Sequence, residues 1–294
     1  MNARFRLAAA SAFRRRLASL LLATAAMMVS AVPAHADMAK IRQSGALKVA
    51  LYKGLPPFSD NVGGQFSGID VALANALGKQ MGLSASLLPF DADDDGMSGD
   101  LRNMVWKGHY LGYGPADVML HVPVDPNFIR QNGQVLIVAP YLREGYVLVY
   151  DSERVHRVSS FEDLAGQATG AEQGSGGASA LLSSANGALR DKVKIYPEAN
   201  EALRALFSGQ IAAAMVTRAQ YESALKAQNQ SATRFVATEL QSPLLPARGW
   251  AIGMAVKADQ RELAQALESA LNALRASGEL QRIFAQYGVS MMAP

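Results

Sequence analysis

Five carboxylates stand within ten residues of this chain, in the stretch DADDDGMSGD from Asp91 to Asp100. Its first, third and fifth residues, followed by Gly96, match the opening D-x-D-x-D-G of a calcium loop, whose oxygens surround a hard cation. A complete loop of that type closes with a bidentate glutamate at its twelfth position, where this chain has Arg102. We therefore expect an acidic loop without a metal, and a looser oxygen cage from the three aspartates is the alternative.

Residues that commonly carry catalysis form no recognisable motif. The sequence has no cysteine, and its four histidines show neither H-E-x-x-H nor H-x₃-H spacing. It also has no G-x-S-x-G and no phosphate-binding loop. We therefore expect a protein that is not an enzyme, with no catalytic residues, no cofactor and no metal.

The amino terminus has the pattern of a secretory signal peptide. Arginines precede a short apolar run, and the small-residue site A-H-A ends at Ala36, so residues 1–36 are expected to be removed. Five of the 28 basic residues and none of the 25 acidic ones lie in that segment, which leaves the mature chain with a net charge of −2. This balance gives no support for nucleic-acid or membrane-surface binding. We expect an unlipidated periplasmic monomer that does not insert into the membrane.

The mature chain alternates strand and helix patterns in two similar runs. Apolar strand segments at 46–54, 84–90 and 116–124 are separated by helical periodicity, and a second run of this kind begins near Tyr146. Short connections between such elements favour open, mostly parallel sheets. Near the carboxyl end, a long helix is predicted to bury one apolar face: Leu263, Ala266, Leu267, Ala270, Leu271 and Leu274.

Several short motifs in this order resemble the periplasmic solute-binding proteins of the family that includes the polar amino-acid binders. The motifs are PPF (56–58), GID (68–70), ADVML (116–120), SFEDLAG (160–166) and ALRASGELQRIFAQYG (273–288). The resemblance implies an α/β fold of the two-lobed periplasmic-binding-protein type II, each lobe a mostly parallel sheet flanked by helices. It places lobe 1 at residues 37–144 plus 248–294 and lobe 2 at 145–247, with two crossings between them.

The same resemblance implies a ligand site between the lobes. Aromatic and apolar residues after the first strand should line it, because ligands bind at the carboxyl ends of parallel strands. A glycine turn before a helix offers backbone N–H groups to an anion. The residues expected at the ligand are Tyr52, Leu55, Phe58, Trp106, His121, Asp125, Arg130, Ser175, Gly176 and Thr217.

Three positions depart from what the family would supply for an α-amino acid. The arginine for the ligand carboxylate fits Arg130 only with a one-residue insertion, and an exposed arginine is the alternative. The acid for the ammonium group is replaced by Thr217. Asp125 is also compatible with a plain turn residue, and the glycine turn with a flexible connection.

Some members of the fold are dehydratases, for which Glu172 would be the candidate acid.

An inserted loop, HYLGYGPA after Gly108, carries His109, Tyr110 and Tyr113. It could line the cleft or form a docking surface for a partner, or its tyrosines could pack down on the domain.

Two functions remain open at the level of the sequence. The first is capture of a small molecule, with an ABC permease as partner. The segments LPPFSDN and PYLREGYVLV resemble a subgroup, the J-type proteins encoded beside quinoprotein methanol and alcohol dehydrogenases. That resemblance implies the second function, an accessory protein that binds a PQQ-dependent dehydrogenase, with cytochrome c as a further possible partner.

Overall fold

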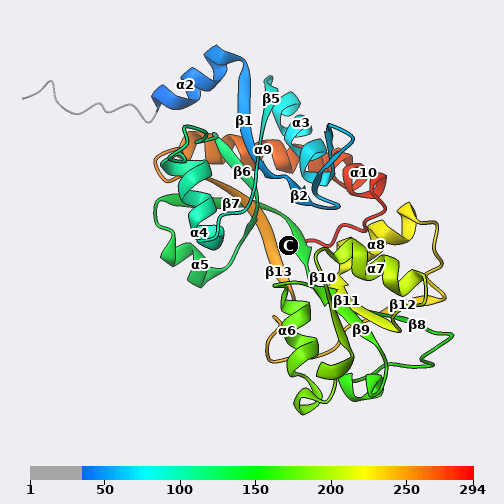
Figure 1. The fold of residues 1–294 in the computed structure, drawn as a ribbon. Helices are drawn as coiled ribbons and strands as arrows, with labels where there is room; N and C mark the ends of the chain where they lie inside the picture. Colours follow the sequence, from blue (N-terminus) through cyan, green and yellow to red (C-terminus); the bar gives the residue numbers. More distant parts are fainter. Residues whose placement is uncertain (1–34) are drawn as a thin grey trace, which may run out of the picture. The chain divides into compact units, whose positions relative to one another are not determined.

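The computed structural model describes residues 35–294 (Figure 1). The predicted signal peptide lies outside the described residues except for its last two, which fall in helix α2 (His35–Ser44). Within 35–294, no helix combines the length and the apolar character needed to cross a membrane.

Two five-stranded sheets organise the described chain, and we call each sheet with its helices a lobe (Figure 1). The sheet of lobe 1 runs, in spatial order, β5 (Ser84–Phe90), β1 (Ala46–Tyr52), β6 (Val118–Pro123), β13 (Trp250–Lys257) and β7 (Val135–Glu144). The sheet of lobe 2 runs β10 (Val193–Tyr196), β9 (Thr169–Glu172), β11 (Ala213–Thr217), β8 (Tyr146–Asp151) and β12 (Phe235–Thr238). Strands β5, β1 and β6 are parallel, as are β10, β9 and β11. β13 and β8 run antiparallel to their neighbours, and the other four strands of each sheet all run in one direction. The predicted mostly parallel α/β sheets are therefore confirmed.

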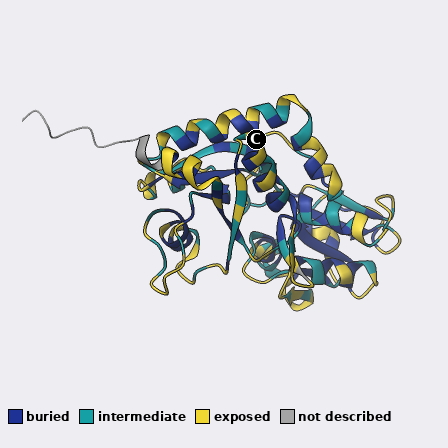
Figure 2. Ribbon diagram, turned by 90° about the horizontal axis from the view of Figure 1, so that it is seen from above, coloured by how far each residue is buried: buried dark blue, intermediate teal, exposed yellow. Residues whose placement is uncertain are grey.

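Helices cover both faces of each sheet, as buried parallel strands require. On lobe 1 these are α3 (Ile69–Gln80), α4 (Gly96–Leu101), a π-helix (Arg102–Trp106), α5 (Pro126–Gln131), α9 (Arg261–Ala276) and α10 (Glu279–Gln286). On lobe 2 they are α6 (Gly176–Ser183), α7 (Ala199–Phe207), α8 (Arg218–Ala227) and three short 3₁₀ turns (Phe161–Leu164, Ala185–Gly187 and Arg190–Lys192). A small hairpin sheet, β2 (Gly54–Leu55), β3 (Ser59–Val62) and β4 (Gln65–Ser67), follows β1. Figure 2 shows the inner strands of the sheets largely buried and the outward faces of the helices exposed, and the edge strands β5 and β10 are only partly buried.

Helix α9 shows how the sequence pattern sets the packing. Its buried residues are Leu263, Ala264, Leu267, Ala270, Leu271 and Leu274. The predicted face is confirmed: Ala266 is only partly buried but packs against the same core, and Ala264 is buried in addition. Burial at every third or fourth residue turns one stripe of the helix toward the core it shares with α3 and the first sheet.

The chain passes between the lobes at two adjacent points. β7 ends at Glu144, Gly145 follows, and β8 starts at Tyr146. The return passage uses Gly249, directly before β13. Gly249 has a φ of +62°, and a Cβ built there would lie 1.9 Å from the Glu144 carbonyl oxygen. The two crossing segments therefore touch through backbone, and only glycine fits at this contact.

Candidate functional site

A pocket of about 500 Å³ lies in lobe 1 at the carboxyl ends of β1 and β5. Its walls include Tyr52, Leu55, Phe90, Met97, Asp100 and His121. The rings of Tyr52 and Phe90 lie 4.6 Å apart and form one side. Of the ten residues predicted at a ligand, Tyr52, Leu55 and His121 meet here. The pocket combines apolar walls with a few polar groups, which is the usual character of a small-molecule site.

Asp100 supplies the deepest acidic group of this lobe 1 pocket. Tyr52 donates its hydroxyl to Asp100 Oδ2 at 2.6 Å, and the Asp93 N–H donates to Oδ1 at 2.8 Å. Burial raises the pKa of Asp100, and these two hydrogen bonds partly oppose the rise. Burial also raises the pKa of Tyr52, with the neighbouring Asp100 charge adding to the effect. The tyrosine is therefore a fixed donor, and the carboxyl group has a defined orientation. Asp100 was not among the predicted ligand residues, although it is the last residue of the acidic stretch 91–100.

Two further carboxylates of the acidic loop, those of Asp91 and Asp93, accept from donors of the protein. Asp91 pairs with Lys53 at 2.7 Å. Asp93 accepts from the Asp95 N–H at 2.9 Å and from the Asn103 side chain. Among residues 35–294, no three histidine, aspartate or glutamate side chains converge as metal ligands.

A buried polar cluster supports the pocket from behind. Asp70, at the start of α3, accepts the Tyr141 hydroxyl at 2.7 Å and lies 3.0 Å from His121 Nδ1. Tyr141 is fully buried, and its oxygen also accepts the His121 N–H at 3.1 Å. Phe58, another predicted ligand residue, is buried with its ring 4.3 Å from the His121 ring. His121 has a φ of +62°, an uncommon conformation for a residue with a Cβ. The cluster thus fixes the orientation of the His121 side chain at the pocket wall.

The glycine turn of lobe 2 (Gly174–Gly177, at the start of α6) makes hydrogen bonds to other groups of the protein. Tyr146 accepts the Gly176 N–H at 3.0 Å, and Ser175 Oγ accepts the Ala178 N–H at 3.0 Å. Adding a Cβ to Gly176 would bring it to 3.1 Å from the Tyr146 ring, so the ring covers this turn. The first amides of α6, which the sequence offered to a ligand anion, are therefore satisfied within the chain.

The other predicted ligand residues have local roles in the described structure. Asp125 caps α5 by accepting the N–H groups of Asn127 and Phe128. Arg130 is exposed on that helix and donates to Asn127. Trp106, the last residue of the π-helix, is half-buried against the core. Thr217 caps α8 in a capping box with Gln220.

Glu172, the candidate acid of the dehydratase alternative, lies 3.5 Å from the Gln220 side chain. Burial raises its pKa.

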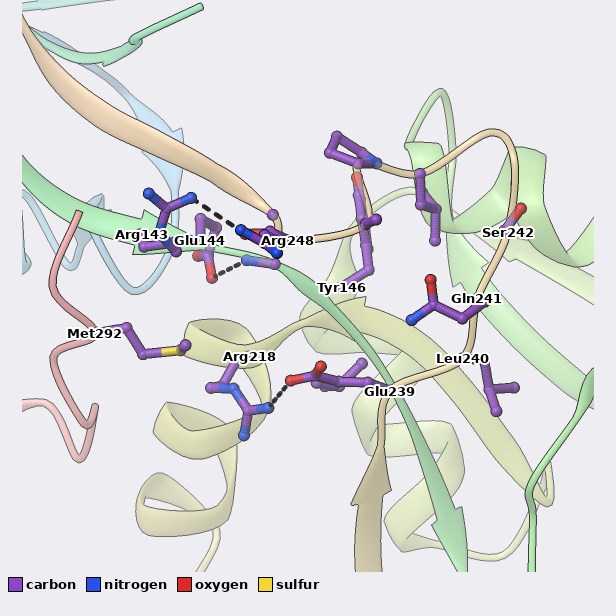
Figure 3. Close-up of a pocket in the computed structure, with 16 residues that line it drawn as sticks. Arg143, Glu144, Tyr146, Arg218, Glu239, Leu240, Gln241, Ser242, Arg248 and Met292 are labelled. Carbon is purple, nitrogen blue, oxygen red and sulfur yellow. Dashed lines mark hydrogen bonds and ion pairs between the residues drawn. The ribbon is translucent and has the colours of Figure 1, made fainter.

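A second cavity, of about 300 Å³, lies at the crossing between the lobes (Figure 3). Its polar walls include Arg143, Glu144, Tyr146, Arg218, Glu239 and Arg248. Arg218 pairs with Glu239 at 2.7 Å, and Arg143 donates to the Arg248 carbonyl at 3.2 Å. The Arg143 guanidinium thus joins the two crossing segments, whereas the Arg218–Glu239 pair lies within lobe 2.

Glu144 is the unusual residue of this cavity wall, and it was not predicted from the sequence. Only 3% of it is exposed, and Oε1 accepts the Gly145 N–H at 3.2 Å. Oε2 is buried with no hydrogen-bond partner among the described residues. Burial raises the pKa of Glu144. The hydrogen bond from the Gly145 N–H and the electrostatic influence of His121 oppose part of this rise. A charged residue at the end of an apolar strand, next to glycine, was the signal available in the sequence.

Glu144→Gln is expected to stabilise the protein at neutral to mildly alkaline pH. The folded state raises the pKa of this carboxyl above its ordinary value of 4.5, so folding favours the protonated form. Ionisation therefore costs stability as the pH rises through the folded-state pKa, and this cost is absent below the unfolded value. We expect a gain of about 1 kcal/mol at about pH 8, the scale of one unsatisfied buried group. The gain should vanish near pH 4.

Urea unfolding at both pH values measures the effect of Glu144→Gln, with the exposed Glu268→Gln as the matched control. A gain that is equal at both pH values would show that ionisation of Glu144 is not its cause.

Comparison with known proteins identifies the fold. No family model matches the sequence, and no curated protein matches it. An ancestral cationic amino acid solute-binding protein is 20% identical, with a TM-score of 0.67 over 86% of this chain and 100% of that chain. A polar amino acid ABC uptake transporter substrate-binding protein from Streptococcus thermophilus is 21% identical, with a TM-score of 0.63 over 87% and 90%. A substrate-binding protein of this kind from Streptococcus pneumoniae, solved with bound histidine, is 17% identical, with a TM-score of 0.62 over 88% and 100%. The chain has the two-lobed fold of these periplasmic-type binding proteins.

Proposed function

We propose that the protein captures a small organic cation between its two lobes and delivers it to an ABC uptake transporter. The observation that carries this proposal is the lobe 1 pocket, where apolar walls surround the oriented carboxyl group of Asp100. A buried carboxylate binds an ammonium or guanidinium group by charge-assisted hydrogen bonds. The similar solved proteins include one named for cationic amino acids and one with bound histidine.

The cationic group, and not an α-carboxylate, is proposed to determine recognition. Arg130 is exposed and donates to Asn127, and the amides of the glycine turn already have partners. An α-carboxylate would have to displace Tyr146 from Gly176 to use that turn. Decarboxylated cations are therefore expected to bind at least as well as the corresponding amino acids.

Two matched pairs test this function: agmatine against L-arginine, and histamine against L-histidine. Thermal denaturation detects binding, because a ligand at a hundred times its Kd stabilises by about 2.7 kcal/mol. We expect stabilisation by agmatine or histamine, lost in Asp100→Asn and kept in the exposed control Asp191→Asn. Tighter binding of the amino acids would refute recognition through the cation alone. No stabilisation by any of the four compounds would count against capture of this ligand class.

The cellular setting belongs to the same proposal. The protein acts in the periplasm as a monomer after loss of its signal peptide, with lobe 1 formed by 37–144 and 248–294 and lobe 2 by 145–247. The strands of the two sheets divide along the chain in the same way, which supports these boundaries.

A second candidate is an accessory protein of a periplasmic PQQ-dependent alcohol dehydrogenase. The observation that favours it is the exposed loop around Tyr110, which offers apolar surface for a protein partner. An accessory protein should co-elute with the purified dehydrogenase and show no stabilisation by small cations. A solute receptor should give the opposite pair of results.

A further inference from the structure

The loop after the π-helix exposes an unusual amount of apolar surface. Six large apolar side chains are exposed in residues 35–294, and three of them lie within four consecutive positions. These are Tyr110 at 88%, Leu111 at 68% and Tyr113 at 40%. Single exposed apolar residues are ordinary, but a contiguous group of them marks an interaction surface.

The loop is ordered by its own contacts. The His109 N–H donates to the Tyr113 carbonyl at 2.9 Å, and the Gly112 N–H donates to the His109 carbonyl at 2.9 Å. The rings of His109 and Tyr113 are stacked, with centroids 4.2 Å apart and an angle of 12°. The Tyr110 ring lies 4.3 Å from the His109 ring, and Tyr110 is nevertheless 88% exposed. Tyr110 and Leu111 do not pack down on the domain, and their exposure is fixed by the turn. A partner would therefore meet a preorganised surface at little cost in conformational entropy.

Beside these rings lies a cavity of about 310 Å³ with acidic walls. The acidic loop contributes Asp91, Asp93, Asp94 and the buried Asp100 to it, and no lysine or arginine lines it. Asp91 and Asp93 are engaged by Lys53 and Asn103. Asp94 is exposed and has no hydrogen bond or ion pair to any described residue. The surface thus combines aromatic faces with an available negative charge, and its electrostatic complement is a cation.

We propose that this loop and cavity dock a segment of a partner protein that carries arginine or lysine next to an apolar residue. The cationic group enters the cavity, pairs with Asp94 and lies against the tyrosine rings. The apolar residue covers Leu111. Guanidinium groups combine both interactions, since they stack on aromatic rings and bind carboxylates through two hydrogen bonds. The acidic lining favours such a partner over a second copy of this chain, whose corresponding surface is equally acidic.

The peptide acetyl-Gly-Arg-Leu-Arg-Gly-amide is the probe, and its citrulline analogue, which lacks the charges, is the matched ligand control. Backbone amide NMR signals of Gly108, Leu111 and Gly112 report on the loop itself. We expect saturable shifts with the arginine peptide, weakened by added salt, and no shifts with the citrulline peptide. Asp94→Asn, and separately Tyr110→Ser with Leu111→Ser, should weaken binding about tenfold, the scale of a charged hydrogen bond. Ile195→Ser, an exposed apolar residue on β10, should leave binding unchanged.

Several results would overturn the proposal. Equal shifts with the two peptides would exclude recognition of the charge, and unchanged binding in Asp94→Asn would exclude the cavity. Arginine methyl ester binding as tightly as the peptide would identify a small-cation site instead. Concentration-dependent association of the protein, lost in the Tyr110→Ser and Leu111→Ser variant, would identify a second copy as the occupant. All substituted side chains are exposed, so each variant is expected to fold.

Discussion

Gly249→Ala is expected to lower the free energy of unfolding by about 3 kcal/mol or more, combining backbone strain with a steric clash. Gly249 adopts a φ of +62°, and its added Cβ would lie 1.9 Å from the Glu144 carbonyl oxygen and 2.9 Å from the carbonyl carbon. Those atoms belong to the other crossing segment, so neither backbone can move without displacing a strand end. The substitution should therefore disturb the connection between the lobes as well as stability.

Urea unfolding measures the loss, and Gly133→Ala is the matched control. Gly133 is exposed, has no positive φ, and would bring its Cβ within 4 Å of no other atom. That control should change stability by no more than about 0.5 kcal/mol. A Gly249→Ala protein as stable as the control would mean that the crossing segments are not held in contact in solution.

Asp70→Ala is expected to cost about 3 kcal/mol, because it removes the acceptor of the buried Tyr141 hydroxyl and the partner of the partly buried His121 ring. The Tyr141 hydroxyl and His121 Nδ1 both lie within 3.0 Å of the Asp70 carboxylate. Tyr141 is fully buried, so water does not replace the lost hydrogen bond. Because His121 lines the lobe 1 pocket, the same substitution should weaken binding of the cation there.

A double-mutant cycle with Tyr141→Phe isolates this contribution. Removing the hydroxyl together with its acceptor should cost less than the sum of the two single substitutions, by about 1 kcal/mol. Strict additivity would show that the hydroxyl and the carboxylate do not stabilise each other. Asp60→Asn, at a partly exposed position of hairpin strand β3 where Oδ1 accepts the Asn61 N–H, is expected to be close to neutral.

The fold was predictable from the sequence because it depends on periodic burial. Helix α9 buries the face that its apolar spacing predicts, with Ala266 only partly buried and Ala264 buried in addition. Both alanines lie near the edge of the stripe, where helix rotation by a fraction of a turn decides burial. That the segment with β13 belongs to lobe 1 followed only from the resemblance. Its position between β6 and β7 was not predicted, because pairing order leaves no periodic signal.

The candidate site was predictable only in part, since it depends on contacts between distant segments. Tyr52 and His121 reach the pocket because they stand at the ends of neighbouring strands. Arg130 and Ser175 are of residue types that bind anions. Arg130, however, lies on α5 and donates to Asn127, and the turn that contains Ser175 is covered by Tyr146. Glu144 is unusual only through burial and a missing partner, and neither property can be read from one residue type.

The interleaved order of the first sheet also constrains the sequence of events during folding. β13 lies between β6 and β7, although more than a hundred residues separate it from each of them along the chain. The strands of the second sheet are all complete by Thr238, before β13 has been synthesised. A chain emerging from its amino end can therefore finish lobe 2 while a gap persists in lobe 1. Edges of β6 and β7 stay unpaired during that interval, and unpaired edges are where wrong pairing and aggregation begin. A chaperone that covers these two edges would protect the chain at its most vulnerable stage.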